Sequence, residues 1–322
     1  MPMIIAAVAP PEGPPTLAAL LSWDLPPLPI LPIAGVVMAG LYCWGLYRVR
    51  GRGIAWSRWR SASFLLGCAA LVLVTGLQIE RYGYSLFSVF MFQHLTLSMT
   101  IPPLLVVGSP GRLLLRATAH HGAGRWVLIA ALTGLRSRAG RIALHPGLTI
   151  PLFLFSYYGL YLSSIFDVLA IKVIGHVSME IFFFASGLLF IIPVLAVGPL
   201  PVRQSNLGRL FDLFVEMPLH VFFGVILMMS STPMLATFAF PSPEWGIDPV
   251  SDQKLAGALA WSYGEPVALL VVLIFCIQWN RDEKEESAVA DRQAEEDGYS
   301  ELNAYNDFLK QIGTETRSRT GR

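Results

Sequence analysis

Residues 173–195 read VIGHVSMEIFFFASGLLFIIPVL, a run of 23 residues with one acidic side chain and no Lys or Arg. About 20 mostly apolar residues in a helix cross the hydrocarbon core of a bilayer, which is about 30 Å thick. Helices suit this task because every backbone polar group in lipid has to find a partner within its own segment. The run therefore predicts a membrane-spanning helix.

The composition of the whole chain agrees with this interpretation. Of its 322 residues, 54% are apolar and 14% are charged, whereas soluble globular proteins carry roughly 25% charged residues. The mean hydropathy is +0.57. The last 42 residues alone hold 7 basic and 11 acidic side chains. An ordinary soluble enzyme is excluded, the lipid bilayer is the expected surrounding, and no nucleic-acid partner is expected.

Six further segments are equally apolar, so we predict an all-α, polytopic membrane bundle of seven transmembrane helices. The predicted spans are 28–47, 61–80, 86–107, 147–167, 173–195, 211–235 and 255–278. Thirteen arginines fall in alternate connections, at Arg48, Arg50, Arg52, Arg58, Arg60, Arg112, Arg116, Arg125, Arg136, Arg138, Arg141, Arg203 and Arg209. The other connections hold only Arg81, Lys172 and Lys254. The positive-inside rule therefore places the N-terminus outside and the C-terminus inside.

This topology divides the chain into three parts. Residues 1–27 form an outer N-terminal segment, residues 28–280 form the seven-helix transmembrane domain, and residues 281–322 form a charged cytoplasmic tail. Within the inner loop 110–145, an apolar stretch around Trp126 is too short and too closely flanked by arginine to span the bilayer. It predicts an amphipathic helix that lies on the inner face of the membrane.

Three of the six histidines lie inside predicted spans, where ionisable side chains are costly and are functional candidates by default. Each has a methionine three residues away, so both side chains share one helix face. The pairs are Met91 with His94, His176 with Met179, and Met217 with His220. Imidazole and thioether donors suit soft Cu(I), although methionine is also a common filler of hydrophobic cores. A fourth histidine, His145, precedes Pro146 and is expected to cap the fourth span.

Depth along the helices separates these donors. A rise of 1.5 Å per residue places His94 about 12 Å and His176 about 5 Å below the outer boundary, whereas His220 is about 22 Å from the outer end of its span. We predict a Cu(I) site in the outer half of the bundle and a second, inner station. The outer ligands are His94, His176, Met91, Met179 and Met228 or Met229, and the inner ligands are His220 and Met217.

Acidic side chains accompany two of these histidines. Glu180 follows His176 by four residues. Glu216 precedes His220 by the same interval. Either carboxylate can therefore orient its imidazole from outside the ligand sphere, and neutral carboxyls that hydrogen-bond between helices are the alternative. The predicted residues around the ligands are Glu180, Glu216, Asp252 and Gln253, of which the last two stand at the outer mouth of the seventh span.

Several short stretches between residues 30 and 280 form an ordered set. They are Gln93–His94 with Pro102, Pro103 and Gly108; His145–Pro146; His176; Gly187 to Pro193; Met217, Pro218 and His220; Trp245–Gly246; Asp252–Gln253 with Gly257; and Trp261. This set resembles the CtaG-type family of bacterial cytochrome c oxidase assembly proteins, which are seven-span membrane proteins.

The resemblance implies a role in maturing cytochrome c oxidase, with oxidase subunits as partners and a multi-pass position in the bacterial plasma (inner) membrane. It further implies the handling of copper for the oxidase copper centres, as a metallochaperone. The family often shows two histidines four residues apart in its third span. Phe90 stands where the first of them is expected, and phenylalanine cannot bind a metal.

The leading hypothesis is a non-enzymatic assembly factor that binds Cu(I) in the outer half of the bundle and presents it to an oxidase subunit. One alternative is a haem b electron carrier with His94 and His176 as axial ligands. Another is a transporter of copper or protons that uses His220, Glu216 and Glu265 as an inner relay.

Overall fold

The computed structural model describes residues 8–198, 204–300, 303–310 and 312, and every regular element among them is helical. No strand occurs in that part of the chain, which confirms the predicted all-α class. The chain divides into two units, Met1–Val272 and Leu273–Arg322. The first unit contains the helix bundle and all the candidate site residues.

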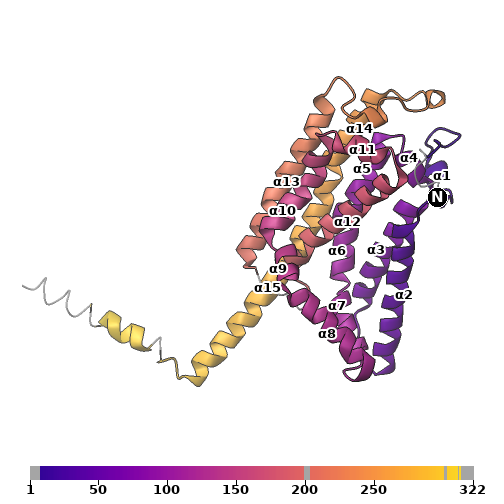
Figure 1. The fold of residues 1–322 in the computed structure, drawn as a ribbon. Helices are drawn as coiled ribbons and strands as arrows, with labels where there is room; N and C mark the ends of the chain where they lie inside the picture. The colour runs from indigo at the N-terminus through magenta and orange to yellow at the C-terminus, as the bar shows by residue number, and fades with distance from the viewer. Residues whose placement is uncertain (1–7, 199–203, 301–302, 311, 313–322) are drawn as a thin grey trace, which may run out of the picture. The chain divides into compact units, whose positions relative to one another are not determined.

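The bundle consists of long helices joined by short ones (Figure 1). In chain order the α-helices are α1 (Leu17–Leu20), α2 (Ile30–Gly51), α3 (Arg58–Gly76), α4 (Gln78–Gly83), α5 (Phe87–Leu95), α6 (Ile101–Val107), α7 (Pro110–Ala117), α8 (Gly122–Arg136), α9 (Arg138–Ala143), α10 (Pro146–Leu154), α11 (Ile165–Ala170), α12 (Val173–Leu195), α13 (Asn206–Met229), α14 (Pro249–Ser262) and α15 (Gly264–Glu296). Two π-helical turns continue α5 and α10, namely η2 (Thr96–Thr100) and η3 (Phe155–Gly159). Two 3-10 turns between α13 and α14 are η4 (Ala236–Phe238) and η5 (Pro243–Trp245).

Six helical stretches among the described residues are long and apolar enough to cross a membrane. They are Ile30–Gly51, Arg58–Gly76, Phe87–Ala117, Val173–Leu195, Asn206–Met229 and Pro249–Glu296. Each coincides with one of the seven predicted spans. The remaining predicted span, 147–167, is continuous helix only over residues 146–161, through α10 and η3. The count of seven and the orientation of the termini therefore remain predictions.

Two predicted spans end earlier than the sequence pattern indicated. The span 61–80 ends at Gly76, because Leu77 is extended with φ −111° and ψ 179°, and Glu80 then lies in the separate helix α4. The span 211–235 ends at Met229, after which Ser230 is extended. The proline at position 233 disfavours helical backbone in the residue before it, so the apolar residues up to 235 belong to a loop.

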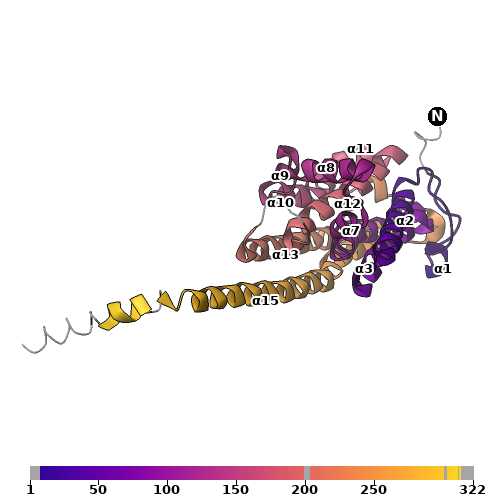
Figure 2. The same cartoon turned by 90° about the horizontal axis from the view of Figure 1, so that it is seen from below.

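The long helices pack in a definite order. α2 packs against α3, α3 against α6, and α6 against α12, while α13 packs against α14. α7 also packs against α2, and the view from below shows both beside α3 (Figure 2). Large apolar side chains such as Tyr47 (78% exposed), Phe214 (73%) and Phe222 (60%) face outward. An apolar exterior of this kind is what lipid contact requires.

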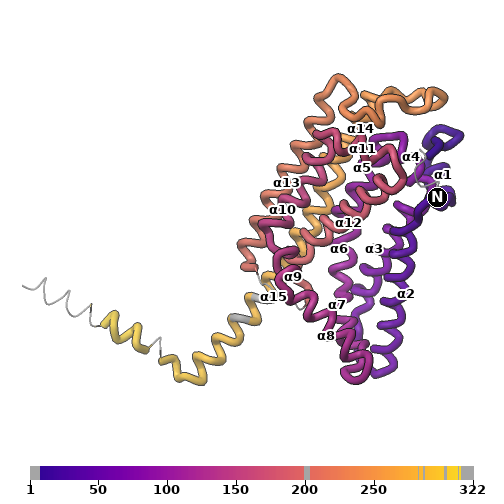
Figure 3. The backbone as a smooth tube through the Cα atoms, in the orientation of Figure 1, coloured from indigo at the N-terminus to yellow at the C-terminus, as the bar shows by residue number. Residues whose placement is uncertain are grey.

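The short elements lie at the two ends of the bundle. α1, α4 and the segment 230–248 lie at one end, named the α4 end here, and α7 and α8 lie at the other, named the α8 end (Figure 3). At the α4 end, Tyr82, Leu86 and Trp245 form a buried apolar cluster against which Leu20 of α1 packs. Contacts between segments far apart in the sequence thus close this end of the bundle.

The loop 110–145, which is predicted to be inner, contains the expected helix, α8, at the α8 end. In α8 only Leu128 is buried, whereas Trp126 is 71% exposed and Val127 and Ile129 are also exposed. An apolar helix face without a protein partner fits a helix that lies in the membrane interface. His145 caps α10, as expected, because its Nδ1 accepts a hydrogen bond of 3.0 Å from the backbone N–H of Gly147.

The second unit contains the charged tail. α15 continues to Glu296, and most of the described side chains beyond Leu273 are exposed. A further helix occupies residues 303–310. Some of the predictions fall outside the described residues. They concern Arg203 of the basic loops and, in the terminal parts, residues 1–7, 301–302, 311 and 313–322.

Candidate functional site

Three buried ionisable side chains meet at the α4 end of the bundle. Glu80 lies in α4, and His176 and Glu180 lie one turn apart near the beginning of α12. One donor atom from each of the three side chains lies within 4.8 Å of the other two. Glu80 Oε1 is 3.5 Å from His176 Nε2, and all three residues are at most 3% exposed.

The atoms that converge on this cluster lack other partners. Glu80 Oε1, His176 Nε2 and Glu180 Oε1 make no hydrogen bond within the described part of the chain. No Lys or Arg among the described residues forms an ion pair with either carboxylate. Buried polar groups are hydrogen-bonded in the great majority of cases, so three unpartnered atoms on side chains that meet in one place are unusual.

A second layer of side chains holds the cluster in place. Gln93 Nε2 donates to the other oxygen of Glu80 at 2.7 Å and to the carbonyl of Val74 at 3.0 Å. A Cβ on Gly83 would collide with the Gln93 side chain, so a glycine there lets α4 approach α5. The Tyr84 ring stacks on that of His176, with centroids 3.8 Å apart. Burial raises the pKa of Glu80, and burial likewise raises the pKa of Tyr84.

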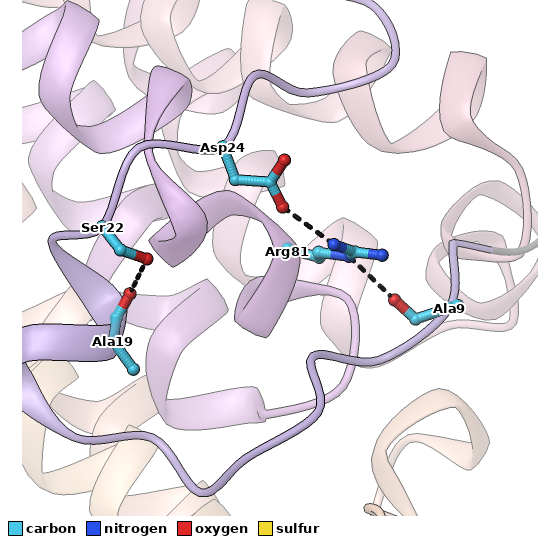
Figure 4. Close-up of polar contacts among 5 residues, drawn as sticks. All are labelled: Ala9, Ala19, Ser22, Asp24 and Arg81. Atoms are coloured by element: carbon cyan, nitrogen blue, oxygen red, sulfur yellow. Dashed lines mark hydrogen bonds and ion pairs between the residues drawn. The ribbon is translucent and has the colours of Figure 1, made fainter.

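The N-terminal segment fastens α4, the helix that carries Glu80. Arg81 forms a 2.8 Å ion pair with Asp24 and donates through Nε to the carbonyl of Ala9 at 3.0 Å (Figure 4). In the same close-up, Ser22 Oγ donates to the carbonyl of Ala19 at 2.7 Å (Figure 4). The Ser22 carbonyl also accepts from the backbone N–H of residue 78, at the beginning of α4. Residues 9–24 therefore cover and position the short helix.

His94 has aromatic rather than charged surroundings. Its Nδ1 is 3.0 Å from the hydroxyl of Tyr161, and its ring stacks on Phe183 at 3.8 Å and on Tyr157 at 4.5 Å. The residue is 0% exposed, and Nε2 has no hydrogen-bond partner in the described part of the chain. A protonated, charged imidazole would be poorly solvated there.

Aromatic rings also connect the surroundings of His94 and His176. Phe90 contacts the His176 ring edge-on at 5.0 Å and Phe183 at 5.9 Å, and Phe183 in turn stacks on His94. The polar neighbours of the two imidazoles differ, because His176 lies beside the Glu80 carboxyl group and His94 contacts the Tyr161 hydroxyl. The haem hypothesis, which needs them to face one another, gains no support from this arrangement.

A second polar group lies in the interior, around His220 of α13. Its Nδ1 is 2.9 Å from Oε1 of Glu216, one turn earlier in the same helix. On the other side of the ring, Nε2 lies 2.5 Å from the place that a Cβ of residue 264 would occupy. The sulfur of Met99 lies 3.2 Å from that same place. Because Gly264 has no side chain, the imidazole nitrogen and the Met99 side chain, whose methyl carbon lies 3.0 Å from that place, both lie close to this glycine.

The local structure around Gly264 explains this proximity. Met99 belongs to the π-helical turn η2, and such turns frequently occur at functional sites. The hydroxyl of Tyr263 contacts the hydroxyls of Thr96 at 3.1 Å and of Thr100 at 3.0 Å, both in η2. These contacts hold the helix that carries Gly264 against Met99. On another side, His220 lines a cavity of about 290 Å³ with other residues that include Met217 and Glu265.

The remaining predicted ligands are methionines in various surroundings. Met91 and Met179 are buried, at 0% and 1% exposure, on the same helices as His94 and His176. Met229 is 81% exposed at the end of α13, and Met228 is half-buried. An exposed side chain at residue 229 does not share the buried surroundings of the histidines, whereas Met217 shares a cavity with His220.

Asp252 and Gln253, predicted to surround the ligands, make well-defined contacts elsewhere. Asp252 accepts from the backbone N–H of Phe87 at 2.6 Å and also from the Ser88 side chain, and so caps the beginning of α5. Gln253 Oε1 accepts from the backbone N–H of Met234 at 2.7 Å. Both side chains thus join α14 to neighbouring segments at the α4 end.

Sequence reasoning passed over two residues on which these groups depend. The apolar run 61–80 makes Glu80 the last residue of a predicted span. An acidic residue at the end of such a run can indicate a site residue. Met99 has no histidine three residues away, so the spacing rule could not find it. Glu80 and Met99 come close to their histidines from other helices. The spacing of residues along one helix does not indicate such contacts.

The fold and the buried groups define a class: a polytopic helical membrane protein with several ionisable residues in its interior. The profile of the family described as "Cytochrome c oxidase caa3 assembly factor (Caa3_CtaG)" matches residues 40–282. The chain belongs to this family, and the resemblance noted in the sequence is confirmed. The family description names assembly factors of a cytochrome c oxidase, and the six long apolar helices suggest a multi-pass membrane position for this chain.

Curated relatives come from mycobacteria. Uncharacterized proteins of Mycobacterium bovis and Mycobacterium tuberculosis are each 36% identical over 311 residues, which cover 93% of this chain and 46% of the relative. An uncharacterized protein of Mycobacterium leprae is 34% identical over 291 residues, covering 87% and 43% respectively. The chain spans about half the length of these relatives. No solved structure matches it.

Proposed function

We propose that this chain supports cytochrome c oxidase assembly as a non-catalytic, copper-binding protein of the bacterial plasma membrane. In this proposal Cu(I) binds inside the bundle at His220 and Met99 and passes from there to an oxidase copper centre. The observation that carries the proposal is that His220 Nε2 and Met99 Sδ both lie close to Gly264, where no side chain separates them. One imidazole and one thioether form a donor set that favours Cu(I) over harder ions.

The position of Glu216 adds to this support. Its carboxylate lies at His220 Nδ1 and therefore favours the tautomer whose proton is on that nitrogen, with the lone pair on Nε2. A metal-binding histidine commonly has such a carboxylate on its far nitrogen.

Release of the ion to a partner needs a path out of the bundle and a second donor. The cavity beside His220 is lined by the thioether of Met217 and the carboxylate of Glu265. Met217 was predicted as an inner ligand, and in the proposal it receives Cu(I) from Met99 on the way to the oxidase subunit. The pair Met91 and His94 and the pair His176 and Met179 remain sequence predictions for further copper contacts.

The test is Cu(I) affinity of the purified full-length chain, measured under reductant by competition with a chromophoric Cu(I) chelator. Met99→Leu removes the sulfur while nearly keeping the side-chain volume. We expect it to weaken Cu(I) binding at least about tenfold, because even the loss of a residue that only supports a ligand commonly weakens metal binding that much. Met229→Leu is the matched control, because that side chain is exposed. Equal affinity in the two variants contradicts the proposal.

A backbone variant tests the same point without removing a donor. Gly264→Ala places a methyl group close to both Nε2 and the sulfur, whereas nothing lies within 4 Å of a Cβ at Gly40. We expect Gly264→Ala to weaken Cu(I) binding and Gly40→Ala to leave it unchanged. Complementation of a host that lacks the factor, read out as assembled caa3-type oxidase, should follow the same order.

A further inference from the structure

We infer that Glu80, His176 and Glu180 form a second metal site, which binds a borderline divalent cation such as Zn(II) in preference to Cu(I). The ion joins α4 to α12 at the α4 end of the bundle. This inference concerns other residues and another class of ion than the Cu(I) proposal, and it does not depend on that proposal.

The composition of the cluster suits a positive partner. Two carboxyl groups and an imidazole are buried together, and none of them forms an ion pair with a Lys or Arg of the described residues. Arg81, the residue next to Glu80, is directed to Asp24 and the Ala9 carbonyl instead. A buried carboxylate without compensation is strongly unfavourable. One divalent ion neutralises two carboxylates at once.

The donor types select the class of ion. Two carboxylate oxygens and one imidazole nitrogen suit Zn(II) and related first-row divalent ions, which bind such atoms at about 2.0–2.2 Å. The three converging donors are oxygens and a nitrogen, with no sulfur among them, whereas Cu(I) prefers thiolate and thioether. Three protein ligands also leave a position for water, as in many open zinc sites.

The geometry already resembles a ligand sphere. Donors around such an ion lie roughly 3–3.5 Å apart, given bond lengths of about 2.1 Å. The three donor atoms lie within 4.8 Å of one another, and the distance between Glu80 Oε1 and His176 Nε2 is 3.5 Å. The Gln93 amide holds the second oxygen of Glu80 at 2.7 Å, as the outer layer of a metal site commonly does. Metal binding therefore requires the three donor atoms to move only slightly closer to one another.

The site also has a structural consequence. α4 is a helix of six residues, too short to be stable by itself, and residues 9–24 are fastened to it through Arg81. An ion shared by α4 and α12 therefore secures the covering segment as well as the helix. Loss of the ion is expected to loosen residues 9–24 and α4 together.

The experiment titrates metal-stripped full-length protein in detergent with Co(II), whose visible absorption reports coordination, and then displaces Co(II) with Zn(II). We expect one Co(II) per chain in the wild type. Glu80→Gln and Glu180→Gln should bind at least about tenfold more weakly. Glu244→Gln, which alters an exposed carboxylate in η5, should bind like the wild type.

Thermal unfolding separates binding from folding. Glutamine keeps the shape of glutamate and removes its charge, so Glu80→Gln without metal should unfold no earlier than the wild type. Added Zn(II) should raise the Tm of the wild type and of Glu244→Gln, since an ion that binds only the folded state stabilises it. It should raise the Tm of Glu80→Gln less than that of the wild type at the same Zn(II) concentration.

Two results overturn the inference. A folded wild type that binds neither Co(II) nor Zn(II) means that the two carboxyl groups share a proton instead. Equal affinity in Glu80→Gln and the wild type means that the ion binds elsewhere. Met99→Leu should retain full Zn(II) binding, so failure of the Cu(I) proposal and failure of this inference are distinguishable in the same set of proteins.

Discussion

His176 and His220 have the same neighbour in sequence but different neighbours in space. Each has a glutamate four residues away on its own helix, one after it and one before it. At the α4 end the third group is another carboxylate, from α4. In the interior a methionine sulfur, from η2, lies close to Gly264, as does the imidazole. A similar pairing of histidine and glutamate thus has a hard donor near it in one place and a soft donor near it in the other.

His94 supplies a third case for this comparison. It is as buried as the other two histidines, but its neighbours are Tyr157, Tyr161 and Phe183 rather than a carboxylate. Its Nδ1 contacts a hydroxyl, and stacked rings occupy both sides of the imidazole. A buried histidine in a span is therefore not by itself a metal ligand, and its cross-helix partners decide its role.

The largest expected effect comes from exchanging the two histidines for alanine, one at a time. His220→Ala should lower Cu(I) affinity at least roughly 100-fold, since a ligand is removed rather than its support, and should leave Zn(II) binding intact. His176→Ala should show the reverse. Chelator competition for Cu(I) and Co(II) displacement for Zn(II) measure both variants. A variant that loses both ions equally would erase the distinction between the two groups.

Glu216→Gln tests the carboxylate that supports the interior histidine. Glutamine can present its amide nitrogen to His220 Nδ1, which removes the preference for a proton on that atom. We expect Cu(I) affinity to fall roughly 10- to 100-fold, the usual loss for an outer-sphere partner, with Zn(II) binding unchanged. Full Cu(I) affinity in this variant would mean that Glu216 has no part in the site.

Tyr263→Phe sharpens the comparison through packing alone. The variant loses the hydroxyl contacts with Thr96 and Thr100 while keeping the ring. Each lost hydrogen bond costs about 1 kcal/mol, and Met99 should become less well placed, so Cu(I) affinity should fall by about tenfold or less. Tyr47→Phe, at a residue 78% exposed, is the control, and Cu(I) competition is the measurement.

The smallest effect is expected at the covering segment. Arg81→Gln removes a partly exposed ion pair with Asp24, which is worth about 0.2–1 kcal/mol. Amide hydrogen exchange in residues 9–24 should accelerate, while the global unfolding free energy should change little. An unchanged exchange rate would show that the other contacts of the segment hold it without Arg81.

Contacts between distant segments explain why the predicted span 61–80 extends beyond the end of the observed helix. The apolar run 61–80 contains no charge until its last residue, so hydropathy extends the span to Glu80. The structure ends the helix at Gly76, because α4 has to turn toward α5 and the N-terminal segment. Composition measures how well a segment suits lipid but not where neighbouring segments bend it.

The amino-acid sequence by itself determined the all-α class, six helices long and apolar enough to cross a membrane, the existence of helix α8, the cap at His145 and the family. Each of these depends on local periodicity, on composition or on an ordered set of short motifs. Only the tertiary structure decided that Glu80 lies against His176 and that Met99 and His220 both lie close to Gly264. Those partners come from other helices, and helix packing brings them together across long stretches of chain. The spacing along one helix reveals which side chains share a face. The side chains of the neighbouring helix that packs against that face determine which ion the site suits.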